Sequence, residues 1–127
     1  MKVIGIDFNA HQMCYIVIEG EQENFDILDY NKIALSSTRS SGDLQTFQVA
    51  VSGLLKDATP NKIAIKQKNE KGFRSMGPAG LKMEGLLLAS AECEVVFISS
   101  KKTQKIELES APKKFVEDAL KSAISAL

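Results

Sequence analysis

Apolar residues occur along the chain in two patterns, short continuous runs typical of strands and the wider spacing typical of helices. Runs rich in β-branched and aromatic residues at 2–8, 13–20 and 27–36 predict three strands in close succession, which favours an antiparallel meander. Two later runs, at 62–67 and 93–100, predict a fourth and a fifth strand. Polar stretches separate all of these runs, as expected for strands joined by surface loops.

Helical spacing of apolar residues predicts three helices between and after the later strands. The first covers 43–57, with Asp43 or Ser41 as its N-cap, and the second begins at Pro78, a residue favoured in the first turn. The third begins after Pro112 and carries one broad apolar face that should pack on the sheet.

The resulting order is strand-strand-strand-helix-strand-helix-strand-helix over one domain, residues 1–127. Strands joined through helices form parallel pairs with right-handed crossovers. The sequence therefore predicts an α/β fold with a mixed five-stranded sheet and flanking helices.

Composition excludes few functions, since 44% of residues are hydrophobic and the net charge is zero. The two halves differ: residues 1–61 hold four basic and eight acidic side chains, and residues 62–127 hold twelve and eight. This difference predicts either a basic surface facing away from an acidic one or ordinary solvated helix faces. No apolar stretch approaches the ~20 residues of a membrane-spanning helix, so we expect a soluble, cytoplasmic protein that does not bind membranes.

Cys14 and Cys93 lie far apart beside apolar residues, which is typical of reduced, mostly buried thiols. His11 and Cys14 have the spacing of metal ligands. A zinc site needs about four such ligands and no second cluster follows, so no structural zinc site is predicted.

Four stretches carry a family resemblance: "VIGIDFN", "KIAIKQ", "GPAGLKMEGLLLASAECEVVFISS" and "FVEDALKSAISAL". In this element order, they resemble the ribonuclease H-like superfamily, and in particular its Holliday-junction resolvase (RuvC) branch. The whole chain also resembles a small uncharacterised bacterial family of this fold, a domain of unknown function.

The resemblance implies a site for two divalent cations held by a cluster of carboxylates, as in the nucleases of this superfamily. Asp7 and Asp118 match two of the four acids, but Lys66 and Phe115 stand where the other two are expected. One ammonium ~4 Å from a divalent cation costs about 8 kcal/mol at an effective dielectric of ~20. We therefore expect no two-metal nuclease activity, no cofactor, and no enzyme of this kind. The alternative is a residual Mg²⁺-dependent nuclease that uses Asp7 and Asp118, with Glu70 as a poor substitute ligand.

Asp7, Lys66 and Asp118, the vestigial candidates for a catalytic site, also have structural interpretations. Asp7 lies inside an apolar strand and needs a partner, which Lys66 or backbone hydrogen bonds would supply. Asp118 lies almost opposite the centre of the helix's apolar face at 100° per residue. It is then equally well interpreted as a solvent-exposed acid near a helix start.

Basic residues near the fourth strand and its neighbours are candidates for nucleic-acid binding. They are Lys66, Lys68, Lys71, Arg74, Lys82, Lys101, Lys102 and Lys105. Only Phe73 lies among them as an aromatic platform, and dispersed surface lysines are the alternative interpretation. A different class of function is a protein-interaction or structural module, or a homodimer, without any nucleic-acid role. No glycine-rich phosphate loop, P-loop lysine pattern or serine–histidine–aspartate arrangement is present.

Overall fold

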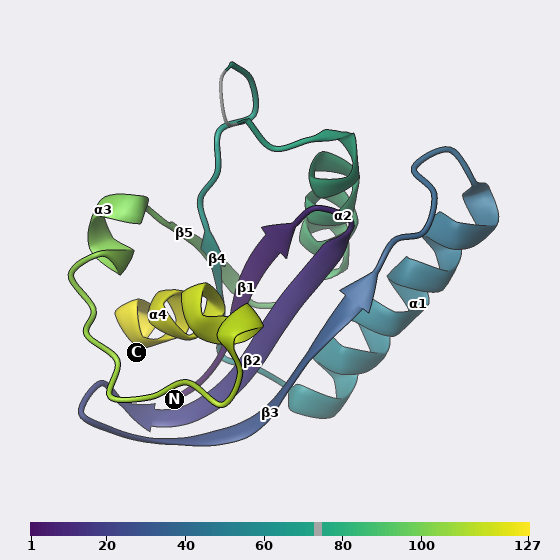
Figure 1. Ribbon diagram of the computed structural model, residues 1–127. Coiled ribbons are helices and arrows are strands. Elements are labelled where there is room, and N and C mark those ends of the chain that lie inside the picture. The colour runs from purple at the N-terminus through teal and green to yellow at the C-terminus, as the bar shows by residue number, and fades with distance from the viewer. Residues whose placement is uncertain (73–74) are drawn as a thin grey trace.

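The computed structural model describes residues 1–72 and 75–127, so Phe73 and Arg74 lie outside the described residues. The elements follow the predicted order, with one unpredicted short helix, α3 (Figure 1). The strands are β1 (Lys2–Asn9), β2 (Gln12–Glu21), β3 (Asn24–Ala34), β4 (Lys62–Lys66) and β5 (Glu94–Ile98). The helices are α1 (Ser41–Ala58), α2 (Pro78–Ser90), α3 (Ser100–Thr103), the 3-10 turn η1 (Lys114–Val116) and α4 (Glu117–Ala126).

A mixed sheet with strand order β3-β2-β1-β4-β5 forms the centre of the molecule. The first three strands make the predicted antiparallel meander, and β4 and β5 extend the sheet in parallel with β1. Parallel neighbours need a connection that returns to the same end of the sheet, and α1 and α2 supply it. The predicted α/β fold with a five-stranded mixed sheet is confirmed.

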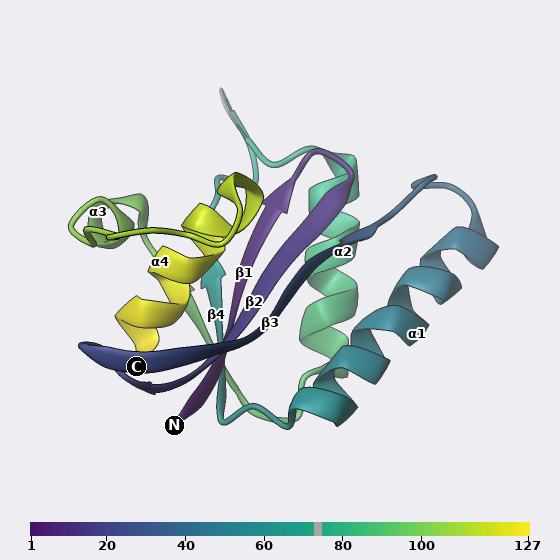
Figure 2. The ribbon, with the colours of Figure 1, turned by 60° about the horizontal axis from the view of Figure 1, so that its bottom comes forward.

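Helices cover both faces of this sheet (Figure 2). On one face, Ile4, Ile6 and Phe8 of β1 join a core cluster that includes Phe47 of α1 and Met83 of α2. The intervening residues of β1 point to the other face, because successive side chains of a strand alternate. Among the described residues, no helix has the length and apolar character needed to cross a membrane.

The other face is covered by α4, which approaches β1 at Gly5. A Cβ atom at Gly5 would lie 2.0 Å from the carbonyl oxygen of Ala119 and 2.8 Å from the Cβ of Ala123. Only glycine permits so close an approach. The predicted apolar face of the last helix is confirmed, since Ala119, Leu120 and Ala123 are buried in this second cluster. The contact holds the first turn of α4 close to the carboxyl end of β1.

The predicted boundaries of the third and fifth strands are wrong. The third strand covers Asn24–Ala34 instead of 27–36, because β2 and β3 both continue into the acidic residues 19–26 and only a two-residue turn separates them. The fifth strand ends at Ile98, after which the chain leaves the sheet and forms α3. The Ser99 side chain starts α3 by accepting a hydrogen bond from the N–H of Lys102 at 3.3 Å.

One predicted helix start is also wrong. Ser40, rather than Asp43 or Ser41, caps α1, and its hydroxyl oxygen accepts a hydrogen bond from the N–H of Asp43 at 3.2 Å. The last helix begins as the 3-10 turn η1 and becomes α-helical only at Glu117.

Candidate functional site

Charged residues gather where β1 and β4 end side by side. The last paired residues of these parallel strands are Ile6 and Ile65, so Asp7 and Lys66 follow at the same edge. Their side chains alternate with those of the α2 face and emerge on the face that α4 covers. Asp118 lies in the first turn of α4, above this edge. The structure thus brings together three residues that the sequence had nominated.

Two ion pairs neutralise these charges. Lys66 Nζ lies 2.8 Å from Asp118 Oδ2 and donates a hydrogen bond to it. Lys68 Nζ lies 2.9 Å from Asp7 Oδ1. The predicted pairing of Asp7 with Lys66 is therefore wrong. Lys66 extends toward α4, whereas Lys68, two residues past it along the chain, turns back over the end of β1.

Asp7 is buried, with 6% of its surface exposed. Its Oδ1 accepts no hydrogen bond from the described residues, although Lys68 Nζ is 2.9 Å away. The ammonium group donates instead to the backbone carbonyl oxygen of Phe8, so its attraction to Asp7 is Coulombic. Losing one partner of a buried ion pair costs ~3–5 kcal/mol. Lys68 is thus the counter-ion that makes this buried carboxylate tolerable.

Asp118 is half-exposed, with 42% of its side-chain surface accessible, but it is not an isolated solvent-facing acid. It lies away from the buried residues of α4, as expected, but the long side chain of Lys66 reaches it from the end of β4. Side chains also lean toward the helix N-terminus, which directs Asp118 to the strand end. Asp118 is thus a partly exposed acid near a helix start that also forms an ion pair with Lys66.

Neither Phe115, which stands where an acid is expected, nor the substitute ligand Glu70 completes a metal site. Phe115 packs against the cluster under α4, and Lys32 Nζ lies 5.0 Å from the centre of its ring, a cation–π contact. Glu70 is exposed and acts on Glu84: burial raises the pKa of Glu84, and the negative charge of Glu70 raises it further. Within residues 1–72 and 75–127, no three His, Cys, Asp or Glu side chains lie close enough together to hold a metal ion.

The candidate pair His11 and Cys14 separates in the structure. His11 lies at the turn between β1 and β2, where its Nδ1 is 3.3 Å from the carbonyl oxygen of Leu35. Cys14 is buried and faces Asp7 across the β1–β2 register. Burial raises the pKa of the Cys14 thiol, and the charge of Asp7 raises it further. The thiol is thus protonated at neutral pH and acts as a small apolar group.

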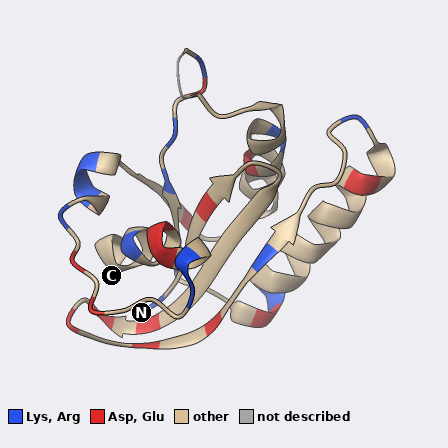
Figure 3. Ribbon diagram, in the orientation of Figure 1, with Lys and Arg blue, Asp and Glu red and all other residues tan. Residues whose placement is uncertain are grey.

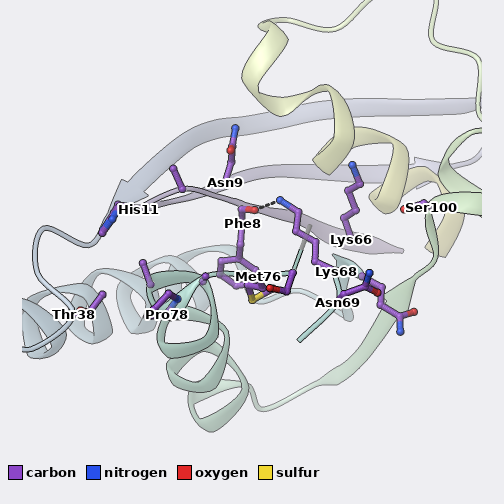
Figure 4. A pocket seen from close by; sticks show the side chains of 16 residues that line it. Phe8, Asn9, His11, Thr38, Lys66, Lys68, Asn69, Met76, Pro78 and Ser100 are labelled. Carbon is purple, nitrogen blue, oxygen red and sulfur yellow. Dashed lines mark hydrogen bonds between the residues drawn. The ribbon is translucent and has the colours of Figure 1, made fainter. Parts of the chain in front are cut away.

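A cleft of about 830 Å³ opens on the α2 side of the same strand ends (Figure 4). Its lining comes from the β1–β2 turn, the segment after β4 and the first turn of α2, with Thr38 and Ser100 at its margins. Lys66 and Lys68 also line it, so the cleft adjoins both ion pairs. The sequence pattern did not reveal this cleft, because its walls come from segments far apart in the chain.

The described basic candidates do not all lie together. Lys71, Lys101 and Lys102 are exposed and follow β4 or β5 at the carboxyl ends of these strands. Figure 3 shows basic residues on α3 and on the loop after β4, and acidic residues near the β2–β3 turn at the other end of the sheet. Lys82 donates to the carbonyl oxygen of Thr38 beside the cleft. Lys105 instead lines a separate groove with acidic residues.

Solved structures with the same arrangement of elements include Holliday junction resolvases. Thermus thermophilus RuvC has a TM-score of 0.81 and 16% sequence identity, with 98% of this chain and 92% of that chain covered. The T. thermophilus RuvC in complex with a Holliday junction substrate has the same TM-score at 17% identity, with 98% and 91% covered. The fowlpox virus Holliday junction resolvase is more distant, with a TM-score of 0.56, 8% identity, and 98% and 94% covered. These likenesses confirm the predicted fold.

Residues 1–125 match the family described as Protein of unknown function (DUF3010), and the chain belongs to that family. No curated protein matches the sequence. The family and the fold thus agree with the resemblance drawn from the sequence, and neither assigns a reaction.

Sequence reasoning found Asp7, Lys66 and Asp118 but missed the role of Lys68. The sequence did show that Lys68 lies two residues after Lys66. In a continuing strand, that spacing would point both side chains to the same face of the sheet. Because β4 ends at Lys66, the backbone turns and Lys68 reaches Asp7 from another side. Arg74, also a binding candidate, lies outside the described residues.

Proposed function

We propose that this protein binds nucleic acid at the carboxyl ends of β1 and β4 and does not cleave it by a two-metal mechanism. One observation carries the proposal. The ammonium groups of Lys66 and Lys68 lie 2.8 and 2.9 Å from Asp118 and Asp7, the two carboxylates that a divalent cation would require.

The charges argue against a metal at this edge. Both carboxylates already have a cationic partner, and a divalent ion would have to displace these ammonium groups or lie beside them. Repulsion of about 8 kcal/mol per ammonium, at ~4 Å and an effective dielectric of ~20, opposes the second arrangement. Phe115 stands where a further acid is expected and has no oxygen to offer, and its ring contacts Lys32 instead. The residues present do not fit a divalent cation, so no catalytic step is assigned to one.

Surface lysines supply the attraction for phosphates. Lys71, Lys101 and Lys102 are exposed at this end of the sheet, and none of them has an ion-pair partner among the described residues. Phosphate contacts of this kind release counterions and bind without sequence preference. The complex of T. thermophilus RuvC with a Holliday junction substrate supports nucleic acid as the ligand class, by analogy of fold.

The test is binding of labelled single-stranded, duplex and four-way DNA over a range of salt concentrations. Wild-type protein should bind at low salt and weaken steeply as salt rises. The triple variant Lys71→Ala/Lys101→Ala/Lys102→Ala leaves both ion pairs intact. It should reduce the log–log salt slope for duplex DNA by ~0.9 for each phosphate that the protein no longer neutralises.

The matched control removes three lysines from the other end of the sheet, in the variant Lys2→Ala/Lys56→Ala/Lys62→Ala. It has the same change in net charge and should bind nearly as wild type does. Absence of binding at low salt, or an equal decrease in affinity in the two triple variants, would contradict the proposed interface.

Self-association is a second candidate function, favoured by exposed apolar side chains on α1 and β3. Val49 of α1 is 72% exposed and Leu28 of β3 is 50% exposed. Such residues are typical of protein contacts when they lie together. A homodimer by solution mass that dissociates in Leu28→Ser/Val49→Ser would support it, and a monomeric mass at high protein concentration would exclude it.

A further inference from the structure

We infer that the cleft on the α2 side of the strand ends accepts one unpaired nucleotide, with its base on the apolar floor and its phosphate at Lys68. The inference rests on the proposed function, because it names the class of nucleic acid held at the same edge. Either a free mononucleotide or an unpaired residue within a strand would supply this chemistry.

The size and floor of the cleft suit a base. Its volume of about 830 Å³ falls within the ~300–1,000 Å³ of typical small-ligand pockets. Phe8, Met76 and Ala79 form an apolar floor that is continuous with the main core. Such a floor favours the flat, weakly hydrated face of a base over a phosphate group alone.

The floor is held in place by its neighbours. A Cβ atom at Gly80 would lie 2.3 Å from Cγ of Met76, so the methionine side chain crosses the first turn of α2 at close range. The N–H of Met76 also donates to the carbonyl oxygen of Asn69, next to a backbone bridge between Asn69 and Ser75. The cleft therefore exists before any ligand arrives.

Amide side chains supply the polar part of the walls. Asn9, Gln67 and Asn69 come from two different segments and belong to the lining of the cleft. Asn69 lies near Met76, whereas Asn9 points away from Phe8 (Figure 4). Each amide offers both donors and acceptors, which is what the edge of a base presents. A paired base hides this edge inside the duplex, so only an unpaired or extruded nucleotide would use these groups.

Lys68 marks where the phosphate would bind. Its ammonium group contacts the carbonyl oxygen of Phe8, at the cleft floor, and the carboxylate of Asp7. An ammonium group has three donors, and the hydrogen bond to Phe8 uses one of them, so donors remain for a phosphate oxygen. Lys66 lines the same cleft and adds a second positive charge.

The test compares two DNA duplexes that differ by one unpaired nucleotide, a single-base bulge that contains 2-aminopurine. The wild-type protein should bind the bulged duplex about tenfold more tightly than the fully paired one, a difference of ~1.4 kcal/mol. The fluorescence of the bulged base should change on binding. A competition arm uses a nucleoside monophosphate and, separately, inorganic phosphate.

Two glycine variants make this test specific. Gly77 lines the cleft in an extended conformation, and a Cβ atom there meets open space, so Gly77→Leu fills the cleft without strain. It should abolish the preference for the bulge and retain binding of the paired duplex. Gly85→Leu adds the same side chain elsewhere on α2, also into open space, and should keep the preference.

The outcomes separate the two proposals. Equal affinity for both duplexes, or a preference that survives Gly77→Leu, would overturn the nucleotide cleft while leaving nucleic-acid binding intact. Failure to bind either duplex at low salt would overturn the proposed function itself. Competition by the nucleoside monophosphate at concentrations where inorganic phosphate has no effect would support the cleft and assign it to free nucleotides as well.

Discussion

At the ends of β1 and β4, the two faces of the sheet differ in how accessible they are to a ligand. On the α4 face, Asp7 and Lys66 are held in ion pairs beneath a closely packed helix. On the α2 face, Phe8 forms the floor of an open cleft. Because side chains alternate along a strand, Asp7 and Phe8 reach these different surroundings although they are adjacent in sequence.

This difference indicates where binding and stability reside. The carboxylates on the α4 face, Asp7 and Asp118, already have cationic partners and offer little to a ligand. The cleft face and the exposed lysines beside it are open to solvent and keep their hydrogen-bonding capacity. Substitutions on the first face should therefore change stability, and substitutions on the second should change binding.

The largest effect is expected where α4 meets the sheet. Gly5→Val would place side-chain atoms where the carbonyl oxygen of Ala119 lies, at 2.0 Å from a Cβ position, and should displace α4. We expect a decrease of more than ~3 kcal/mol in the free energy of unfolding, beyond the usual ~1–3 kcal/mol cost of overpacking, because the clash is with backbone. Urea unfolding followed by circular dichroism measures it.

The control for this variant is Gly53→Ala in α1, where a Cβ atom meets nothing within 4 Å. It should stabilise the protein by up to ~1 kcal/mol, since alanine favours helix over glycine. A Gly5→Val protein as stable as wild type would contradict the packing described for α4.

A smaller decrease is expected when Asp7 is deprived of its counter-ion. Lys68→Met should reduce the free energy of unfolding by ~1–3 kcal/mol, less than for a fully buried pair because Lys68 is partly exposed. The double variant Asp7→Asn/Lys68→Met should be more stable than Lys68→Met alone. Additive effects in this double-mutant cycle would show that the two residues are not coupled.

A third variant restores negative charge on the α4 face. Lys66→Glu adds a carboxylate beside Asp7 and Asp118. The variant should therefore have a lower melting temperature than wild type without metal, and Mn²⁺ should raise that temperature. Metal at 100 times its dissociation constant would raise stability by ~2.7 kcal/mol. Lys66→Gln is the neutral control. An equal Mn²⁺-induced increase in wild-type melting temperature would contradict exclusion of the metal by the lysines.

The smallest effect concerns Glu84 on α2. Burial, with a further contribution from Glu70, raises its pKa, so the folded state favours the protonated acid. The stabilisation this provides is present below the ordinary pKa of 4.5 and disappears as the pH rises through the folded-state pKa. Glu84→Gln should therefore raise stability at neutral pH by less than ~1 kcal/mol and flatten its acidic pH dependence. Thermal melts from pH 4 to 7, with Glu92→Gln as an exposed control, measure this difference.

Much of the fold could be predicted because it depends on periodicity. The runs at 62–67 and 93–100 are short, apolar and flanked by polar residues, and both are strands. The apolar stripe after Pro112 covers the sheet as α4. Helix α3 could not be foreseen, since Ser99 and Ser100 suit a strand end as well as a helix start.

The site was harder to predict, because it depends on where long side chains go once the strand ends. Sequence spacing nominated Asp7, Lys66 and Asp118, and the register brings them together. It named Lys66 as a partner of Asp7 and missed Lys68, because the actual partner depends on how the chain turns after β4. The cleft depends on tertiary contacts between distant segments.

The most direct test of binding without cleavage uses labelled four-way DNA, incubated with wild-type protein in chelator and in Mn²⁺ and followed on native and denaturing gels. We predict a salt-sensitive complex in both conditions and intact DNA strands throughout. Strand cleavage that requires Mn²⁺ and disappears in Asp7→Asn would contradict this prediction.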